Sequence, residues 1–156
     1  MRTIDELIAD SPTFAGLEQA QLEFIAGCAW NEHVERGTML MREGEPADKF
    51  FLIRRGVVAL EIGSPGRGAL VIETLEPGDV LGWSWLFAPY RWVFDGRAVE
   101  PTSLITFDGA CLRGKCEQDH DLGFALMHRF AGKIVERLQA TRLQLLDVYG
   151  RAPASA

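Results

Sequence analysis

The sequence lacks long apolar runs, an excess of basic residues and the cysteine pattern of a disulfide-rich protein. No stretch of its 156 residues approaches the roughly 20 apolar residues that cross a bilayer, and the N-terminus has no signal-peptide core, so we expect a cytoplasmic protein with no membrane contact. The net charge of −6 argues against a nonspecific grip on nucleic acid, which needs clustered Lys and Arg. The three cysteines form no even-numbered disulfide framework, which is consistent with a reducing compartment.

A catalytic or metal-binding constellation is also missing. Cys111, Cys116 and His120 are close in the sequence, but the spacing of the two cysteines differs from the tight knuckle of structural zinc sites, and no fourth ligand is evident. Ser84 lies between two tryptophans and lacks the Gly-x-Ser-x-Gly pattern of hydrolases. We therefore predict a non-enzymatic protein with no catalytic residue and no metal site.

The apolar pattern divides the chain into three parts. Residues 1–32 have the spacing of short helices, residues 33–107 contain short β runs bounded by Gly, Pro, Asn or Asp, and residues 108–150 return to helical spacing. We expect one domain, residues 1–150, and a frayed polar tail, residues 151–156. Many short strands predict a sandwich or jelly roll. The predicted strands are 39–41, 50–53, 57–62, 69–74, 80–81, 92–94 and 103–107.

A long helix is expected at the C-terminal end, over residues 121–149. At 1.5 Å per residue it would span roughly 40 Å. Part of its apolar pattern has the 4-3-4-3 spacing of a coiled-coil seam, which predicts a homodimer paired through this helix. The seam residues are Ile134, Leu138, Thr141, Leu145 and Val148.

The most specific signal is a glycine-punctuated stretch, residues 37–98. Its glycines at turn positions include Gly37, Gly44, Gly56, Gly78 and Gly82. With the order of helices and strands, this framework resembles the cyclic-nucleotide-binding domain of the catabolite activator family and of kinase regulatory subunits. The resemblance implies a mainly β fold with flanking helices: a double-stranded β-helix, or jelly roll, with short N-terminal helices and a long C-terminal dimerisation helix.

In the catabolite activator family, a helix-turn-helix domain follows the long helix. This sequence continues only five residues past Arg151. We therefore expect no DNA-reading helix on this chain, no nucleic-acid partner, and an output that passes to a separate effector protein.

The resemblance also locates a ligand-binding cassette, residues 82–98, and shows how it departs from the family. In the family a Glu follows the position of Gly82 and accepts a hydrogen bond from a ribose hydroxyl. This sequence has Trp83 there, which offers one N–H donor and no acceptor. The family's phosphate-binding Arg falls on Trp92. Arg91 lies one residue earlier, on the opposite face of a strand unless a bulge restores the register.

Other cassette positions are partly retained. Backbone N–H groups of a short helix over residues 84–87 can still hold an anion. A glycine inside a strand often marks a bulge, so Gly96 is a candidate position for one. Thr141 matches a family Thr that contacts the base, whereas Val93 replaces a Ser or Thr. The candidate pocket residues are Gly82, Trp83, Ser84, Trp85, Arg91, Trp92, Val93 and Thr141.

Two interpretations of the aromatic residues in the cassette remain open. The side chains of Trp83, Trp85, Phe87, Tyr90, Trp92 and Phe94 form a reshaped pocket or fill the vacated site, and alternation along a strand favours filling. The first interpretation predicts a non-enzymatic sensory or regulatory module with a degenerate pocket, acting through a separate partner. Its ligand would be a cyclic nucleotide or another small planar anion. The alternative is a ligand-independent assembly or adaptor subunit.

Overall fold

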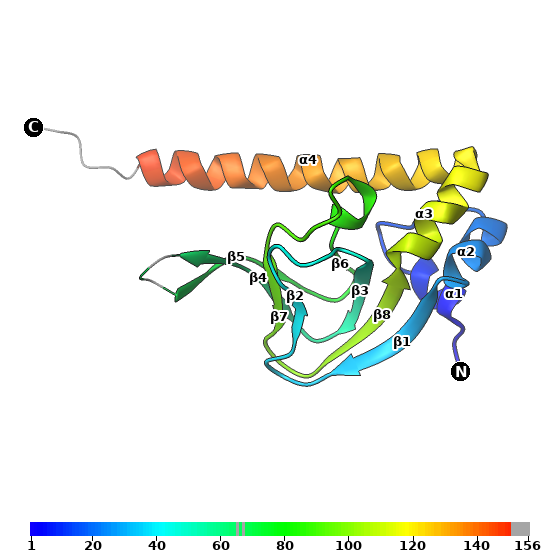
Figure 1. Ribbon diagram of the computed structural model, residues 1–156, viewed down its shortest axis with the longest axis horizontal. Helices are drawn as coiled ribbons and strands as arrows, with labels where there is room; N and C mark the ends of the chain where they lie inside the picture. Colours follow the sequence, from blue (N-terminus) through cyan, green and yellow to red (C-terminus); the bar gives the residue numbers. More distant parts are fainter. Residues whose placement is uncertain (65, 67, 151–156) are drawn as a thin grey trace, which may run out of the picture.

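The computed structural model describes residues 1–64, 66 and 68–150, and the predicted frayed tail lies outside the described residues. Two four-stranded antiparallel sheets form a β-roll that is flanked by the N-terminal helices and by one long C-terminal helix (Figure 1). This confirms the predicted mainly β jelly roll. The elements are α1 (Ile4–Ala9), α2 (Gln19–Ala26), β1 (Ala29–Val34), β2 (Met39–Met41), β3 (Lys49–Arg55), β4 (Val58–Ser64), β5 (Gly68–Leu75), β6 (Val80–Leu81), η1 (Ser84–Leu86), β7 (Asp95–Ala98), β8 (Thr102–Asp108), α3 (Gly109–Gln118) and α4 (His120–Gly150).

The strand orders are β1-β8-β3-β6 in one sheet and β2-β7-β4-β5 in the other. The apolar residues of strand β3 contribute to two hydrophobic cores, one facing the helices and one between the sheets. Phe50 and Leu52 point toward the helices, while Phe51 and Ile53 point between the sheets, because successive side chains of a strand alternate in direction. The helix-facing core is rich in stacked rings, with the centroids of Phe50 and Phe107 4.2 Å apart.

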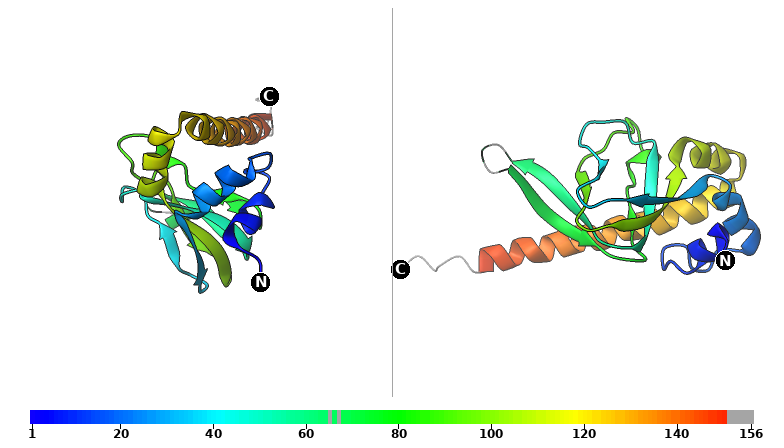
Figure 2. Two further views of the ribbon diagram at one scale, coloured as in Figure 1. Left: turned by 90° about the vertical axis from the view of Figure 1, so that its right-hand side faces the viewer. Right: turned by 90° about the horizontal axis from the view of Figure 1, so that it is seen from below.

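Helix α4 lies along one side of the β-roll, and its C-terminal half extends in the same direction as the β4–β5 hairpin (Figures 1 and 2). Its first half packs on the domain through Leu122, Leu126 and Phe130, which are all buried. From residue 138 to residue 150 every residue is exposed. In the described part of the chain, no helix has the length and apolar character needed to cross a membrane.

Two boundaries differ from the sequence predictions. The β-roll begins at Ala29, so β1 occupies a segment that was assigned to the N-terminal helices. The predicted strand over 92–94 is wrong, and the strand in this region is β7. The chain before β7 bonds instead to the turn after β2: the Trp92 N–H donates to the Glu45 carbonyl, and the Gly44 N–H donates to the Trp92 carbonyl. These hydrogen bonds replace the regular inter-strand hydrogen bonds that a strand over 92–94 would form.

The sequence analysis found no even-numbered disulfide framework and did not predict a disulfide, but two of the three cysteines form one. Cys28 and Cys111 are 83 residues apart in sequence, yet they are joined by a disulfide with a Cα–Cα distance of 5.8 Å. The fold brings them together because the Asp108 N–H donates to the Cys28 carbonyl, which places the start of α3 beside the end of α2. Cys116 is the free cysteine. An odd number of cysteines therefore does not support a reducing compartment here.

Candidate functional site

The cassette begins at Gly82, where the backbone and the neighbouring ring both require glycine. Gly82 has φ +99°, a region that residues with a Cβ rarely adopt. A Cβ at this position would also lie 2.9 Å from Cζ3 of Trp92, well inside van der Waals contact. The Trp92 ring thus lies directly against the backbone of the cassette, and Trp92 itself is buried between the two sheets.

The interior of the cassette contains almost no free space. The cavity that remains there has a volume of about 10 Å³. A cavity needs roughly 10–15 Å³ to hold a single water, so this space holds one water at most. Its lining comprises Met41, Leu60, Gly82, Trp83, Ser84, Trp92, Val93, Phe94 and Arg137.

Arg137 of α4 closes the outer side of the cassette. Its guanidinium carbon lies 4.3 Å from the centroid of the Trp83 ring, which is a cation–π contact. Phe94 meets the same ring edge-on at a centroid distance of 6.4 Å. Arg137 also forms an ion pair with Glu73 of β5, with Nε and Oε2 2.5 Å apart. One side chain thus joins the helix to both the cassette and the second sheet.

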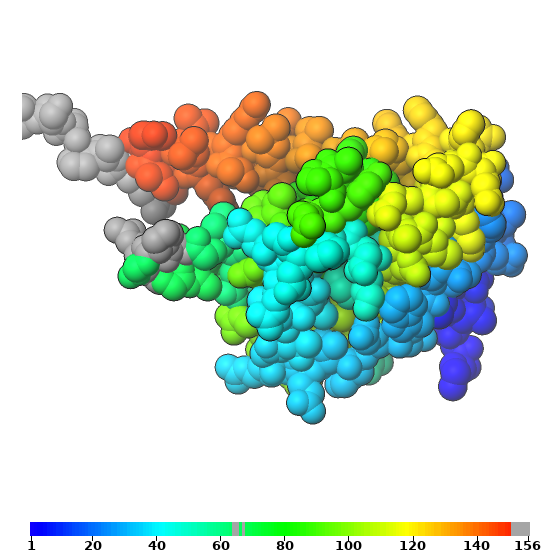
Figure 3. All heavy atoms as spheres, in the orientation of Figure 1, coloured from blue at the N-terminus to red at the C-terminus, as the bar shows by residue number. Residues whose placement is uncertain are grey.

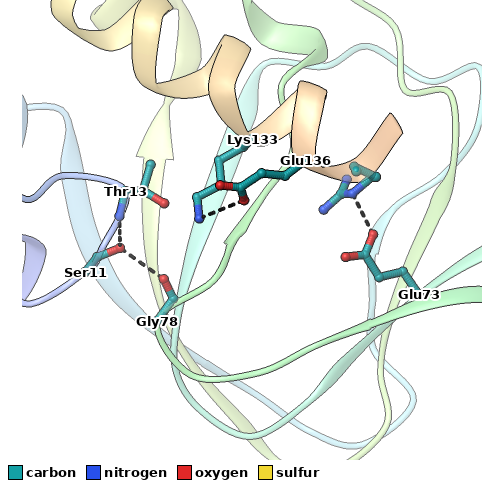
Figure 4. A network of polar contacts seen from close by, with 7 residues as sticks. Ser11, Thr13, Glu73, Gly78, Lys133 and Glu136 are labelled. Carbon is teal, nitrogen blue, oxygen red and sulfur yellow. Dashed lines mark hydrogen bonds and ion pairs between the residues drawn. The ribbon is translucent and has the colours of Figure 1, made fainter. Parts of the chain in front are cut away.

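The electrostatics of Arg137 reflect this position. Burial lowers its pKa below the ordinary arginine value, and the nearby carboxylates of Glu73 and Asp79 oppose that shift. Figure 4 shows Glu73 reaching from the β-roll toward α4, close to the Lys133–Glu136 ion pair on the helix. The guanidinium keeps its charge, because even a lowered arginine pKa stays far above neutrality.

Two hollows flank this contact. The smaller, about 220 Å³, includes the charged residues Asp79, Lys133 and Glu136 in its lining. The larger, about 630 Å³, is mainly apolar and lies between the β4–β5 hairpin and α4. In the space-filling view of Figure 3, the green cassette segment packs against the middle of the helix. The larger hollow is lined by Ile62, Leu70, Val71, Ile72, Glu73, Trp83, Phe94, Ile134, Arg137, Leu138, Thr141 and Gln144.

Comparison with known proteins identifies the family of this fold. A family model described as the cyclic nucleotide-binding domain matches residues 31–119. The chain belongs to the cyclic nucleotide-binding domain family. Among solved structures, a cyclic nucleotide-binding protein of Geobacter metallireducens is 29% identical, with a TM-score of 0.78 over 88% of this chain and 99% of that one.

Two curated relatives show the range of proteins that contain this domain. A protein of Rhodopseudomonas palustris described as a potassium channel protein is 26% identical over 149 residues, 96% of this chain and 35% of that protein. A CRP-like cAMP-activated global transcriptional regulator of Mycobacterium tuberculosis is 22% identical over 145 residues, 93% of this chain and 63% of that protein. The chain therefore spans about a third to two thirds of the length of these relatives.

In this cyclic nucleotide-binding domain, Arg91 does not reach the cassette interior. It is exposed, and its Nη1 donates a hydrogen bond to the Gly44 carbonyl at 2.8 Å. Val93 is likewise exposed, while Trp92 between them is buried. The register irregularity expected near Gly96 lies in the facing strand β2 and leaves Arg91 outside.

The remaining candidate residues fall into three different environments. Ser84 begins the short helix η1 and lines the cassette cavity. Trp85 belongs to the helix-facing core, where it stacks on Phe50 at 4.6 Å between centroids. Thr141 lines the larger hollow, and its hydroxyl donates to the Arg137 carbonyl in its own helix. The structure therefore gathers part of the sequence-predicted pocket, Gly82, Trp83, Ser84, Trp92 and Val93, around the cassette cavity. It places Trp85, Arg91 and Thr141 elsewhere.

Arg137 and Glu73 were missed by the sequence analysis. The sequence did contain a signal that Arg137 lies on the face of the helix that packs on the domain. Leu122, Leu126 and Phe130 follow a four-residue spacing on the buried face of α4, and Arg137 lies seven residues, or about two turns, beyond Phe130 on that face. Within the described residues, no group of His, Cys, Asp and Glu side chains could hold a metal ion.

Proposed function

We propose that this domain is a non-enzymatic regulatory module whose nucleotide site is closed by its own side chains. The observation that carries the proposal is the cassette cavity of about 10 Å³, which leaves no room for a ribose or a cyclic phosphate inside the cassette. Trp83 stands where the family has its ribose-binding Glu, and the Trp92 ring occupies the space next to Gly82. Neither indole can accept a hydrogen bond.

The side chain of Arg137 provides, within the chain itself, the link between α4 and the cassette that a bound ligand provides in the family. A ligand changes a regulatory equilibrium only through contacts that differ between two states. Here the guanidinium of Arg137, stacked on Trp83 and paired with Glu73, already joins α4 to the cassette. The helix is thereby held against the β-roll without a small molecule.

The output surface that we propose is the exposed part of α4. Leu138, Leu145 and Val148 of the predicted seam are 49%, 55% and 67% exposed, which is unusual for apolar side chains on one face of a helix. Ile134 and Leu138 also line the apolar hollow below the β4–β5 hairpin. A second copy of the domain, paired along α4, would cover this seam, and a separate effector would read the resulting dimer.

Isothermal titration of the domain with cAMP and with cGMP tests the closed site. We expect no binding heat for either nucleotide up to millimolar concentration. Saturable heat with one site per chain would overturn the proposal and favour a sensor in which the aromatic side chains move to admit the nucleotide. Titration with AMP serves as the control for nonspecific attraction of a nucleotide phosphate.

A further inference from the structure

The Cys28–Cys111 disulfide lies where three parts of the domain meet. Cys28 is between the end of α2 and the start of β1, and it is buried. Cys111 is in the first turn of α3, where its N–H donates to the Asp108 side chain that caps the helix. The disulfide therefore fastens the start of α3 to the N-terminal helices.

Helix α3 in turn contacts the cassette. Arg113 donates to the Trp85 carbonyl in η1, and its guanidinium lies 4.2 Å from the Tyr90 ring centroid. The Lys115 ammonium donates a hydrogen bond to the backbone carbonyl of Phe24 in α2 at 2.6 Å. It also forms a cation–π contact with the ring of Phe24. Movement of α3 would disturb all of these contacts.

The same helix is packed tightly on the beginning of α4. A Cβ at Gly123 would meet the Cys116 Cβ at 3.3 Å, so the backbone of α4 approaches α3 closely at this point. The two helices are joined through Asp119, whose carboxylate accepts from the Leu122 N–H. A restraint on α3 is therefore also a restraint on the base of α4.

We propose that the Cys28–Cys111 disulfide is a redox-modification site for a dithiol reductant, and that its state sets how firmly α3 and α4 are held on the domain. In reduction, one thiolate of the dithiol attacks the Cys111 sulfur, because Cys111 is the more exposed of the two residues, and Cys28 leaves as a thiolate that takes up a proton. The second thiol of the reductant then attacks the mixed disulfide, and Cys111 leaves. Two electrons and two protons reach the domain, and the reductant becomes a disulfide.

The third cysteine does not compete with this exchange. Burial raises the pKa of the Cys116 thiol, and the carboxylates of Asp119 and Glu117 raise it further. Cys116 is therefore protonated at neutral pH and is a poor nucleophile toward the neighbouring disulfide. The exchange runs with an external dithiol instead of by internal reshuffling.

Thiol counting and hydrogen exchange on the same protein test this proposal. Air-oxidised protein, denatured and treated with maleimide, should label at Cys116 alone, and protein treated first with dithiothreitol should label at all three cysteines. Amides of α3 and of the first turns of α4 should exchange several-fold faster after reduction, while those of β4 stay unchanged. Labelling of all three cysteines in the oxidised sample, or identical exchange in both samples, would overturn the proposal.

Two variants separate the disulfide from other effects of the reductant. Cys28→Ser should show the fast exchange of α3 without any reductant and no further response to it. Cys116→Ser should respond to reduction as the unmodified protein does. If Cys28→Ser does not fold, the hydrogen exchange of α3 in oxidised and in reduced unmodified protein still tests the proposal. A Cys116→Ser variant that fails to respond would place the redox effect at Cys116 and contradict the assignment.

Discussion

Arg137 lies over the ring of Trp83, with its guanidinium carbon 4.3 Å from the ring centroid. This contact joins the long helix to the cassette position at which the sequence analysis predicts a departure from the family. Glu73 holds the other edge of the guanidinium. The side chain of Arg137 therefore contacts the cassette and the second sheet at once.

Replacement of Arg137 by Ala should loosen α4 without unfolding the β-roll. We expect a loss of about 1–2 kcal/mol in the free energy of unfolding, since a half-desolvated cation–π contact and an ion pair disappear together. Amides of α4 beyond Phe130 should also exchange faster. Arg142→Ala, an exposed change on the same helix, is the matched control. Equal stability of the two variants would mean that the stacked contact contributes nothing.

Replacement of Gly82 by Ala should be more damaging than the same change at Gly37. Both glycines have positive φ, +99° and +89°, so both variants carry backbone strain of about 1 kcal/mol. At Gly37 no atom lies within 4 Å of the new Cβ, whereas at Gly82 it would overlap the Trp92 ring. We expect Gly82→Ala to lose about 1–3 kcal/mol more in chemical denaturation. Similar losses would show that the ring moves aside easily and that the cassette is loosely filled.

Replacement of Leu138 by Asp should dissociate the proposed dimer. The change places a carboxylate in an apolar seam, where burial of an unpaired charge is strongly unfavourable. Gln139→Asp adds the same charge one residue away, off the seam, and should leave the dimer intact. Light scattering of both variants at matched concentration gives the mass. A Leu138→Asp variant that keeps the mass of the unmodified dimer would refute the seam assignment.

Alkylation of Cys116 in oxidised protein should accelerate only at alkaline pH. Its thiol pKa is raised in the folded state, so the reactive thiolate appears above the ordinary value of about 8.5. The same shift lowers stability as the pH rises through the folded-state pKa, because the unfolded thiol loses its proton first. Iodoacetamide rates measured against pH, with urea-unfolded protein as control, provide the test. Coincident profiles would contradict the role assigned to burial and to the two carboxylates.

The β-roll was predictable because its signals are local. Alternating apolar residues and turn glycines indicate strands such as β3 and β8 wherever they occur, and the departure at Trp83 follows from one position in a family framework. The boundary of β7 was not predictable, since backbone bonds to the turn around Gly44 and Glu45 replace the ladder there. A strand prediction from residue types contains no information about such a partner.

The contacts that the sequence analysis missed are long-range. Glu73 and Arg137 are far apart in the sequence, and so are Cys28 and Cys111. A charged residue on a helix is exposed in most proteins, so only its spacing from the buried residues before it could have singled out Arg137. The outward direction of Arg91 follows from its position one residue before the family's Arg, because a one-residue shift in an extended chain reverses the side chain.

The central claim is that Trp83 and Trp92 close the nucleotide site, and their indole N–H groups report on it directly. The domain has four tryptophans, so a two-dimensional NMR spectrum resolves each indole while cAMP is added to millimolar concentration. We predict that the Trp83 and Trp92 signals stay as fixed as those of Trp30 and Trp85, which lie outside the cassette cavity. Saturable shifts confined to Trp83 and Trp92 would contradict the account and show that the site opens to admit the nucleotide.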